Sequence, residues 1–187
     1  MPSPSLSSSS PELIAYIDGG SRGNPGPAGF GVVIQDAKGH TLDTIAEFLG
    51  GATNNVAEYR ALLAALEYAT EKKCQRLKVY CDSELIARQM QGRYRVQSPD
   101  LKPLYQRAQD LVHLLDRFAI EHIPRERNQQ ADRLANEAMD QGGAAPTERT
   151  LAFLAVFEKG KLQPLATAPE LEEGAEYEIR ARKRIPK

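Results

Sequence analysis

Hydrophobic and polar positions alternate in short runs over the first part of the chain. Runs of this length, rich in β-branched and aromatic residues and bounded by Gly, Pro or polar residues, predict β-strands. Three of them follow one another: residues 12–18, 29–36 and 40–50. The Gly- and Pro-rich segment 19–29 predicts a loop, and AKG at 37–39 predicts a tight turn. These short connections favour an antiparallel meander.

The period of the pattern changes after the third predicted strand. Apolar side chains then recur at helical spacing: Val56, Tyr59, Leu62, Leu63, Leu66 and Ala69. Thr53, Asn54 or Asn55 is expected to cap this helix. Further along, the pattern predicts a strand, two helices, a strand and a last helix. Their ranges are 77–82, 83–92, 98–115 (starting at Ser98 or Asp100), 118–124 and 131–142.

The order β-β-β-α-β-α-α-β-α predicts a single α/β domain. A strand that follows a crossover helix pairs in parallel with the strand it joins in the sheet. The strand 77–82 is therefore expected to lie parallel to the strand 12–18. Asp18 and Asp82, which close these two runs, would then leave the same edge of the sheet. Open α/β sheets place their sites at this edge.

Four acidic residues stand at edges of predicted elements: Asp18, Glu58, Asp82 and Asp132. Two of them close strands and two lie in the first turns of helices, so the four side chains can converge in space. A cluster of hard oxygen ligands is how proteins hold Mg²⁺, and a pair of such ions catalyses in-line phosphoryl displacement. Taken singly, each acid has an ordinary alternative as a turn residue, a cap or a solvated carboxylate.

Length and composition allow one ordinary domain and an extra piece, since the chain has 187 residues and is 41% hydrophobic. We expect a Ser- and Pro-rich disordered segment at 1–11, a catalytic domain at 12–143, and a linker with a small β appendage at 144–187. No apolar run reaches the length of a membrane span, and no secretory signal is recognised. Cys74 and Cys81 form neither a disulfide framework nor a zinc pattern, so a cytoplasmic location is expected.

The net charge of −1 argues against a general nucleic-acid binder. Basic residues nevertheless gather in one stretch around a single acid, Asp100. They are Arg88, Arg93, Arg95, Lys102 and Arg107. These side chains either neutralise nucleic-acid phosphates or form a solvated face.

Four blocks of the sequence, in this order, resemble the type-1 ribonuclease H family. They are DGGSRGNPGPAGFGVVI, TNNVAEYRALLAAL, VYCDSELI and PRERNQQADRLANEA, and together they cover about residues 12–142. The resemblance implies a five-stranded mixed sheet of order 3-2-1-4-5 with helices on both faces. It implies hydrolysis of the RNA strand of RNA–DNA hybrids, leaving 5′-phosphate and 3′-hydroxyl ends. It also assigns metal ligation and catalysis to one acid per block: Asp18, Glu58, Asp82 and Asp132. Two Mg²⁺ ions are the expected cofactors, with Mn²⁺ as the alternative.

The chain departs from many bacterial members of that family at two places. Their His in the loop before the last acid is missing here, and Arg125 stands in its place, as in the archaeal-type branch. A guanidinium cannot act as a general base, so Arg125 either holds the scissile phosphate, assists product departure, or is merely an exposed strand-end Arg. The basic protrusion between residues 92 and 100 is also missing. Weaker hybrid binding, or binding that depends on Arg93, Arg95 and the C-terminal piece, is expected.

The family pattern also indicates residues that contact substrate: Gly19, Asn24, Thr53, Asn54, Asn55 and Ser83. The Asn side chains offer donors and acceptors for the 2′-hydroxyls that distinguish RNA from DNA. Thr53 is a candidate contact to a phosphate of the DNA strand, and Gly19 allows close approach of the backbone to the RNA. Turn geometry and helix capping are the alternatives for these positions.

Other readings keep the fold and change the substrate, as in resolvases, transposases or exonucleases of the same superfamily. The proofreading exonuclease type expects Asp-x-Glu on the first strand, which Asp18-Gly19-Gly20 lacks. A non-catalytic binding module is disfavoured because all four acids are present. The segment 155–179 is similar to short antitoxin-like β proteins of prokaryotes. A monomer is expected, with oligomerisation through the appendage as the alternative.

Overall fold

The computed structural model describes residues 12–143, 155–158 and 161–164. The chain divides into two compact units, Met1–Thr147 and Glu148–Lys187. In the second unit the described residues form two short antiparallel strands, β6 (Ala155–Glu158) and β7 (Lys161–Pro164), within the expected β appendage. The rest of the appendage, the linker and the N-terminal segment lie outside the described residues. The domain boundary at residue 143 and the similarity to antitoxin-like proteins stay predictions.

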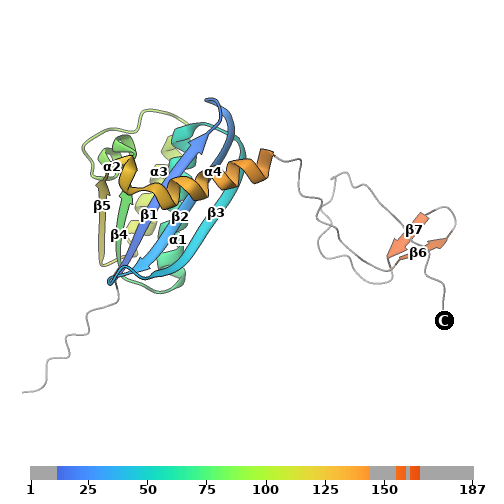
Figure 1. The fold of residues 1–187 in the computed structure, drawn as a ribbon, viewed down its shortest axis with the longest axis horizontal. Helices are drawn as coiled ribbons and strands as arrows, with labels where there is room; N and C mark the ends of the chain where they lie inside the picture. The colour runs from blue at the N-terminus through green and yellow to red at the C-terminus, as the bar shows by residue number, and fades with distance from the viewer. Residues whose placement is uncertain (1–11, 144–154, 159–160, 165–187) are drawn as a thin grey trace, which may run out of the picture. The chain divides into compact units, whose positions relative to one another are not determined.

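The first unit is built on one five-stranded mixed sheet. Its strands are β1 (Glu12–Ser21), β2 (Gly26–Asp36), β3 (Thr41–Ala52), β4 (Arg76–Cys81) and β5 (Arg117–His122). Their order in the sheet is β3-β2-β1-β4-β5 (Figure 1). The first three strands are antiparallel, whereas β1, β4 and β5 are parallel to one another. The predicted fold class and strand order are therefore confirmed.

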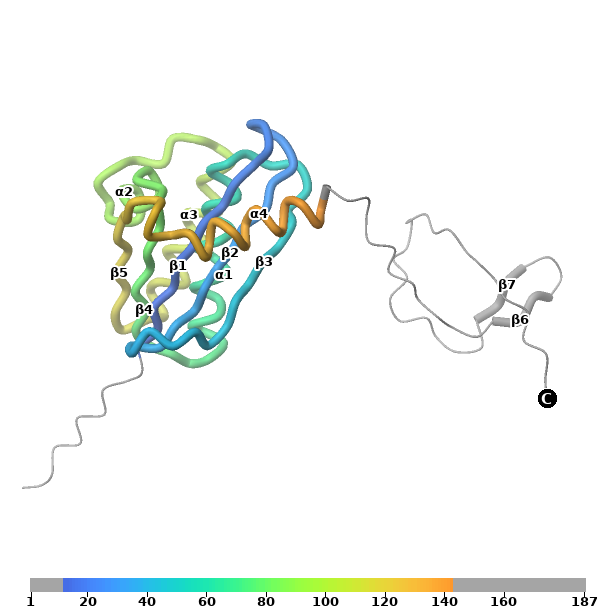
Figure 2. The backbone as a smooth tube through the Cα atoms, in the orientation of Figure 1, coloured from blue at the N-terminus to red at the C-terminus, as the bar shows by residue number. Residues whose placement is uncertain are grey.

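Helices cover both faces of this sheet. They are α1 (Asn54–Glu71), α2 (Glu84–Met90), α3 (Leu101–Val112) and α4 (Gln129–Gly143), with a short 3-10 helix η1 (Arg125–Arg127) before the last of them. The helix α1 packs on β1, β2 and β4 and also contacts α3. On the opposite face of the sheet, α4 crosses β1, β2 and β3 (Figures 1 and 2). The main core lies between the sheet and α1, where Tyr59, Leu62 and Leu66 are fully buried.

The first strand is longer than its sequence pattern predicts. It continues past Asp18 through Gly19 and Gly20 to Ser21, and the residues expected to form a loop pair with β2 in register Gly19↔Phe30 and Gly20↔Gly29. The prediction that Asp18 ends its strand is therefore wrong. The physical reason is that these glycines serve close packing rather than a turn, because both helical layers approach the sheet closely at this point.

Two residues for which capping was a predicted role, Thr53 and Ser83, are the N-caps of helices in the structure. The Thr53 hydroxyl accepts a hydrogen bond from the Val56 N–H at 3.3 Å, which makes Thr53 the N-cap of α1. Ser83 caps α2 in the same way, accepting from the Ile86 N–H at 3.5 Å. These caps satisfy backbone donors that the helices leave unpaired. They also fix where Glu58 and Asp82 stand relative to the helix ends.

Candidate active site

Strand register places Asp18 beside Asp82. The parallel strands β1 and β4 pair Ile17 with Cys81, so the next residue of each chain segment is an aspartate. Asp18 lies within β1, while Asp82 is the first residue after β4. The two acids are therefore neighbours across the sheet, although only Asp82 stands at a strand end.

The third acid comes from α1, whose first turns lie against β1. A Cβ atom on Gly19 would stand 2.3 Å from both Ala57 C and Glu58 N, a distance that real Cβ atoms do not reach. The absence of a side chain at Gly19 is therefore what lets α1 approach the strand so closely. This contact brings Glu58 next to the residue that follows Asp18 in sequence.

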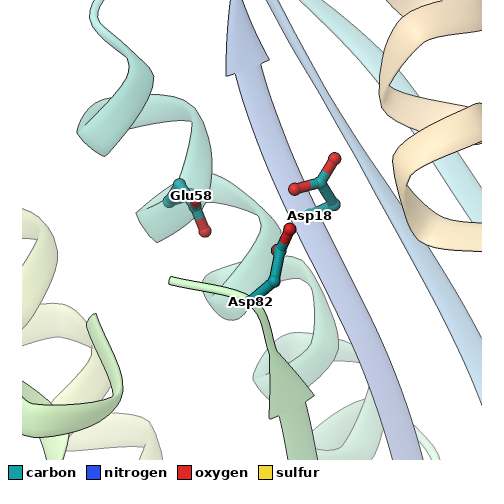
Figure 3. A group of neighbouring side chains, drawn as sticks. All are labelled: Asp18, Glu58 and Asp82. Carbon is teal, nitrogen blue, oxygen red and sulfur yellow. The ribbon is translucent and has the colours of Figure 1, made fainter. Parts of the chain in front are cut away.

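The three carboxylates form one cluster. Each of Asp18, Glu58 and Asp82 offers an oxygen, and these oxygens all lie within 4.8 Å of one another. Figure 3 shows the side chains pointing toward a common space from β1, α1 and the end of β4. Asp18 and Glu58 are only 7% and 5% exposed, and Asp82 is half-buried. Negative charges that are this close together and this little exposed to solvent destabilise the folded protein unless a cation or a proton compensates them.

The pKa values of the buried acids are raised as a result. Burial, followed by the charge of Asp82, raises the pKa of Asp18 to about 7. Burial, followed by the charges of Asp18 and Asp82, raises the pKa of Glu58 well above its ordinary value. One oxygen of Glu58 is buried and has no hydrogen-bond partner within the part of the chain that the structure describes. A divalent cation would supply both the missing partner and the missing positive charge, so the donor set fits a metal site of hard oxygen ligands.

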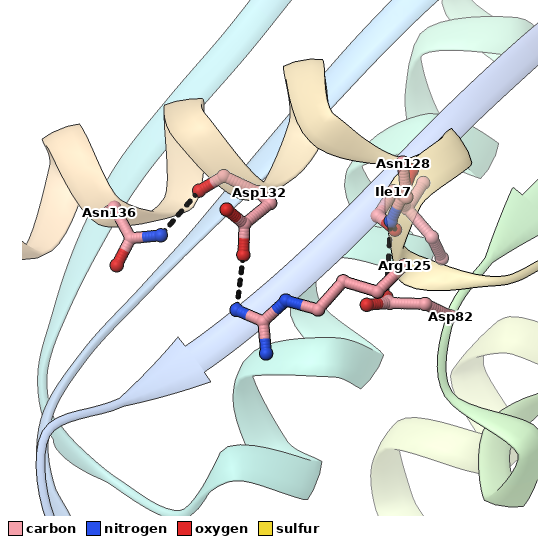
Figure 4. A network of polar contacts seen from close by, with 6 residues as sticks. All are labelled: Ile17, Asp82, Arg125, Asn128, Asp132 and Asn136. Atoms are coloured by element: carbon pink, nitrogen blue, oxygen red, sulfur yellow. Dashed lines mark hydrogen bonds and ion pairs between the residues drawn. The ribbon is translucent and has the colours of Figure 1, made fainter.

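The fourth predicted acid is placed differently. Asp132 lies in the first turn of α4 and is paired with the guanidinium of Arg125, which extends from η1 (Figure 4). Among the described residues it is not part of the three-acid cluster. Its charge nevertheless contributes to raising the pKa of Asp18, so it stands near the site. The Arg125 side chain is 70% exposed, and its hydrogen bond with Asp132 raises its pKa.

The sequence analysis missed Asn128, which lies between η1 and α4. Its side chain is buried, and its amide nitrogen donates to the Ile17 carbonyl at 2.8 Å and to Asp82 Oδ1 at 3.1 Å (Figure 4). An Asn before a predicted helix reads as a cap from sequence alone. The contact with Asp82 crosses from one segment of the fold to another, so the sequence carries no signal for it.

The predicted substrate contacts lie around the cluster, and their roles stay predictions. Gly19 belongs to β1, and Asn24 to the connection after it, where its side-chain oxygen accepts from the Asn54 N–H at 3.3 Å. Asn54 and Asn55 open α1 directly after its cap, Thr53. Ser83, the cap of α2, directly follows Asp82 in the chain.

Part of the basic stretch also gathers near the end of β5. Arg88, Arg93 and His122 contribute to the lining of a pocket of about 270 Å³ that reaches Glu121. Arg88 is held by Glu84 at 3.4 Å on the same helix. Phosphate binding and a solvated face both remain open for these side chains.

The fold and the acidic site together define a ribonuclease H-like domain with a metal-binding site. A family model described as reverse transcriptase-like matches residues 16–138. The bifunctional protein Rv2228c of Mycobacterium tuberculosis is 48% identical over 130 residues, which are 69% of this chain and 36% of that protein. Ribonuclease HI of Halobacterium salinarum is 44% identical over 126 residues, covering 67% and 63% of the two chains.

The chain also matches solved structures over most of their length. The crystal structure of LC11-RNase H1 in complex with an RNA/DNA hybrid aligns with a TM-score of 0.68 and 46% identity, covering 71% of this chain and all of that one. The chain belongs to the ribonuclease H family. It spans only about a third of the mycobacterial relative. No helix within the described part of the chain is long and apolar enough to cross a membrane.

Proposed function

We propose that this protein is a metal-dependent endoribonuclease that hydrolyses the RNA strand of RNA–DNA hybrids and leaves 5′-phosphate and 3′-hydroxyl ends. The observation that carries the proposal is the cluster of three carboxylates within 4.8 Å, two of them buried. Relatives support the substrate: one at 44% identity is named ribonuclease HI, and one at 46% identity was solved with an RNA/DNA hybrid.

The acids are proposed to hold two Mg²⁺ ions, with Mn²⁺ as the alternative. When bound, such ions lower the pKa of a water and stabilise the leaving oxygen. Three residues of this chain would bind the ions. Asp18 is positioned by β1, Glu58 by α1, and Asp82 by the end of β4. Asp132 is proposed as the fourth ligand. It would have to exchange its ion pair with Arg125 for a cation.

Arg125 is proposed to bind the scissile phosphate. Its side chain is exposed and stands beside the acids, which lets a planar fork of donors reach a phosphate that approaches the cluster. Because the guanidinium stays protonated, its task is binding and charge compensation rather than proton transfer. A phosphate bound by Arg125 would also free Asp132 from its present partner.

The residues around the acids are proposed to recognise the hybrid. Asn24, Asn54 and Asn55 present amides at the start of α1, suited to 2′-hydroxyls of the RNA strand. Thr53 is proposed to contact a phosphate of the DNA strand. Gly19 and Ser83, which adjoin Asp18 and Asp82, are proposed to contact the RNA strand at the cleavage site.

The finer assignments are proposals as well. We place the protein in the cytoplasm, which the buried thiol of Cys81 supports, and we expect a monomer. Residues 12–143 are proposed as the catalytic domain, because the family match at 16–138 lies inside that range. Deleting residues 144–187 should leave hydrolysis intact, and loss of activity in a folded truncation would refute this division.

One assay tests the function. Labelled hybrid, duplex DNA and duplex RNA are incubated with the protein and Mg²⁺, with EDTA added, and with the Asp82→Asn variant. We expect cleavage of the hybrid alone, abolished by EDTA and by the substitution. Asn at this position still accepts the bond from Asn128, so the variant keeps the local fold while removing a ligand charge. Equal cleavage of duplex DNA would rule out the proposed substrate.

A further inference from the structure

We propose that Asn128 is a positioning residue that fixes the carboxylate of Asp82 and ties together the segments that carry the acids. The proposal rests on the function proposed above, since it concerns the same site. Asn128 is absent from the residues that the sequence analysis assigns to catalysis or binding.

The side chain of Asn128 is held by two acceptors. It is 1% exposed, and its Nδ2 donates to the carbonyl of Ile17 at 2.8 Å and to Asp82 Oδ1 at 3.1 Å. Because a backbone carbonyl and a carboxylate can only accept, the amide must present its NH₂ group to both. The hydrogen bonds therefore settle which way the amide faces. They connect Asp82 to the residue that precedes Asp18.

The backbone of Asn128 is used as fully as its side chain. Its N–H donates to the carbonyl of Arg125 at 2.9 Å, and its carbonyl accepts from the N–H of Asp132 at 3.1 Å. One residue thus contacts β1 beside Asp18, the carboxylate that follows β4, and both members of the Arg125–Asp132 pair (Figure 4). A displacement of Asn128 would move all three parts of the site relative to one another.

Helix capping does not account for this side chain. A capping Asn accepts a backbone N–H with its side-chain oxygen, whereas Asn128 Oδ1 is buried and has no hydrogen-bond partner in the described structure. A buried acceptor without a hydrogen-bond partner destabilises the folded state. A residue chosen for stability alone would not carry this cost, so the useful part of the amide is its NH₂ group. That group binds one oxygen of Asp82, and so restrains the carboxylate that belongs to the cluster.

Substitutions separate positioning from stability. We would measure Mg²⁺ binding by calorimetry without substrate, kcat and KM on the hybrid, and the melting temperature, for Asn128→Ala and for Gln89→Ala. Gln89 is a matched control, because it is a buried amide, 4% exposed, that bonds the Tyr59 hydroxyl and no carboxylate. Partners that orient metal-ligating groups typically contribute about 10- to 100-fold to metal affinity or activity.

For Asn128→Ala we expect about tenfold weaker Mg²⁺ binding and a kcat lower by about 10- to 100-fold, with KM changed by less than about twofold. Gln89→Ala should lower the melting temperature and leave Mg²⁺ affinity and kcat as in the wild type. Asn128→Asp keeps the shape but loses the donors, so it should be impaired at least as much as Asn128→Ala. A folded Asn128→Ala protein with wild-type Mg²⁺ affinity and kcat would overturn the proposal.

A measurement on the wild-type protein covers the case in which the variants do not fold. In an NMR titration with MgCl₂, the side-chain amide signals of Asn128 should shift with the same dissociation constant as the backbone amide of Asp82. The side-chain amide of Gln106, which bonds Asp110 on the outside of α3, is the control and should not move. An Asn128 signal that stays still while Asp82 shifts would refute the positioning role. A wild-type protein that binds Mg²⁺ in this way but leaves the hybrid intact would refute the proposed function alone.

Discussion

The acids of the site fall into two groups that are built in opposite ways. Asp18, Glu58 and Asp82 stand on packed elements, lie close together and are shielded from solvent, and none of the three forms an ion pair among the described residues. Asp132 stands at the start of α4 and is neutralised by the exposed Arg125. The carboxylates of the first group repel one another, and a bound cation would reduce this repulsion. Asp132 is already paired with the positive charge of Arg125.

The largest expected effect comes from breaking the packing under the first group. In Gly19→Ala the new methyl group would overlap the backbone of Ala57 and Glu58, so α1 must shift away from β1. We expect hydrolysis to fall by at least about a hundredfold, since small displacements of reacting groups cost that much, and stability to fall by about 1–3 kcal/mol or more.

The control for this substitution is Gly51→Ala, because nothing lies within 4 Å of the position a Cβ would take there. That variant should retain both activity and stability. Activity assays, Mg²⁺ titration and chemical denaturation together make the comparison. Wild-type Mg²⁺ affinity in Gly19→Ala would show that the close contact does not position Glu58.

The next largest effect should come from the exposed pair. For Arg125→Ala we expect turnover to fall about 10- to 100-fold, because a phosphate-binding charge is lost. The melting temperature should change little, since exposed ion pairs contribute at most about 1 kcal/mol. Arg127→Ala removes another exposed Arg of η1 and should have little effect on turnover. Single-turnover kinetics provide the measurement, and unchanged rates for Arg125→Ala would exclude it from the site.

A smaller effect concerns stability without metal. Removing a repelling charge by Asp18→Asn should raise the free energy of unfolding by about 1 kcal/mol or more at pH 8, in the presence of EDTA. Asp132→Asn, which removes a paired and partly exposed charge, should change it by less than about 0.5 kcal/mol. Denaturant titrations of both variants test the contrast between the groups. Equal changes would mean that burial does not separate them.

The last prediction concerns the dependence of stability on pH, which has the same origin as the effect of Asp18→Asn. Burial raises the pKa of Asp18 to about 7 in the folded protein, from 3.8, so between these values the folded state binds a proton that the unfolded state has lost. The contribution of Asp18 to the free energy of unfolding is therefore present at low pH and falls as pH rises from about 4 to about 7. In EDTA, the melting temperature of the Asp18→Asn variant should not show the part of the fall with rising pH that is due to Asp18. Saturating Mg²⁺ should oppose the fall in the wild type, because cations bind the deprotonated acids.

Much of the fold could be predicted from the sequence because its periods are local. The change from alternation to helical spacing at Val56 marks α1, and the crossover rule gives the parallel pairing of β4 with β1. The extension of β1 through Gly19 and Gly20 could not be predicted. Glycine usually signals a turn, and only the close approach of α1 at Gly19 and of α4 at Gly20 explains these residues within a strand.

The site was predictable only in part, and for a related reason. The four acids could be located because one stands in each block that resembles the ribonuclease H family. Two of the expected positions were nevertheless wrong, since Asp18 lies within β1 and Glu58 lies just past the first turn of α1. The pairing of Asp132 with Arg125 and the reach of Asn128 to Asp82 depend on how η1 meets the sheet. No local sequence pattern predicts how η1 packs against the sheet. Contacts between segments that are distant in sequence need the folded geometry.

One oxygen of Glu58 is buried without a hydrogen-bond partner among the described residues, and this has a consequence for how the protein responds to its surroundings. Protons and divalent cations would compete for the oxygens of this cluster, and the pKa of Asp18, raised to about 7, places that competition near neutrality. A lower concentration of divalent cations, or acidification, would then reduce the fraction of sites that hold a cation. The fraction of molecules ready to work would track both conditions at once.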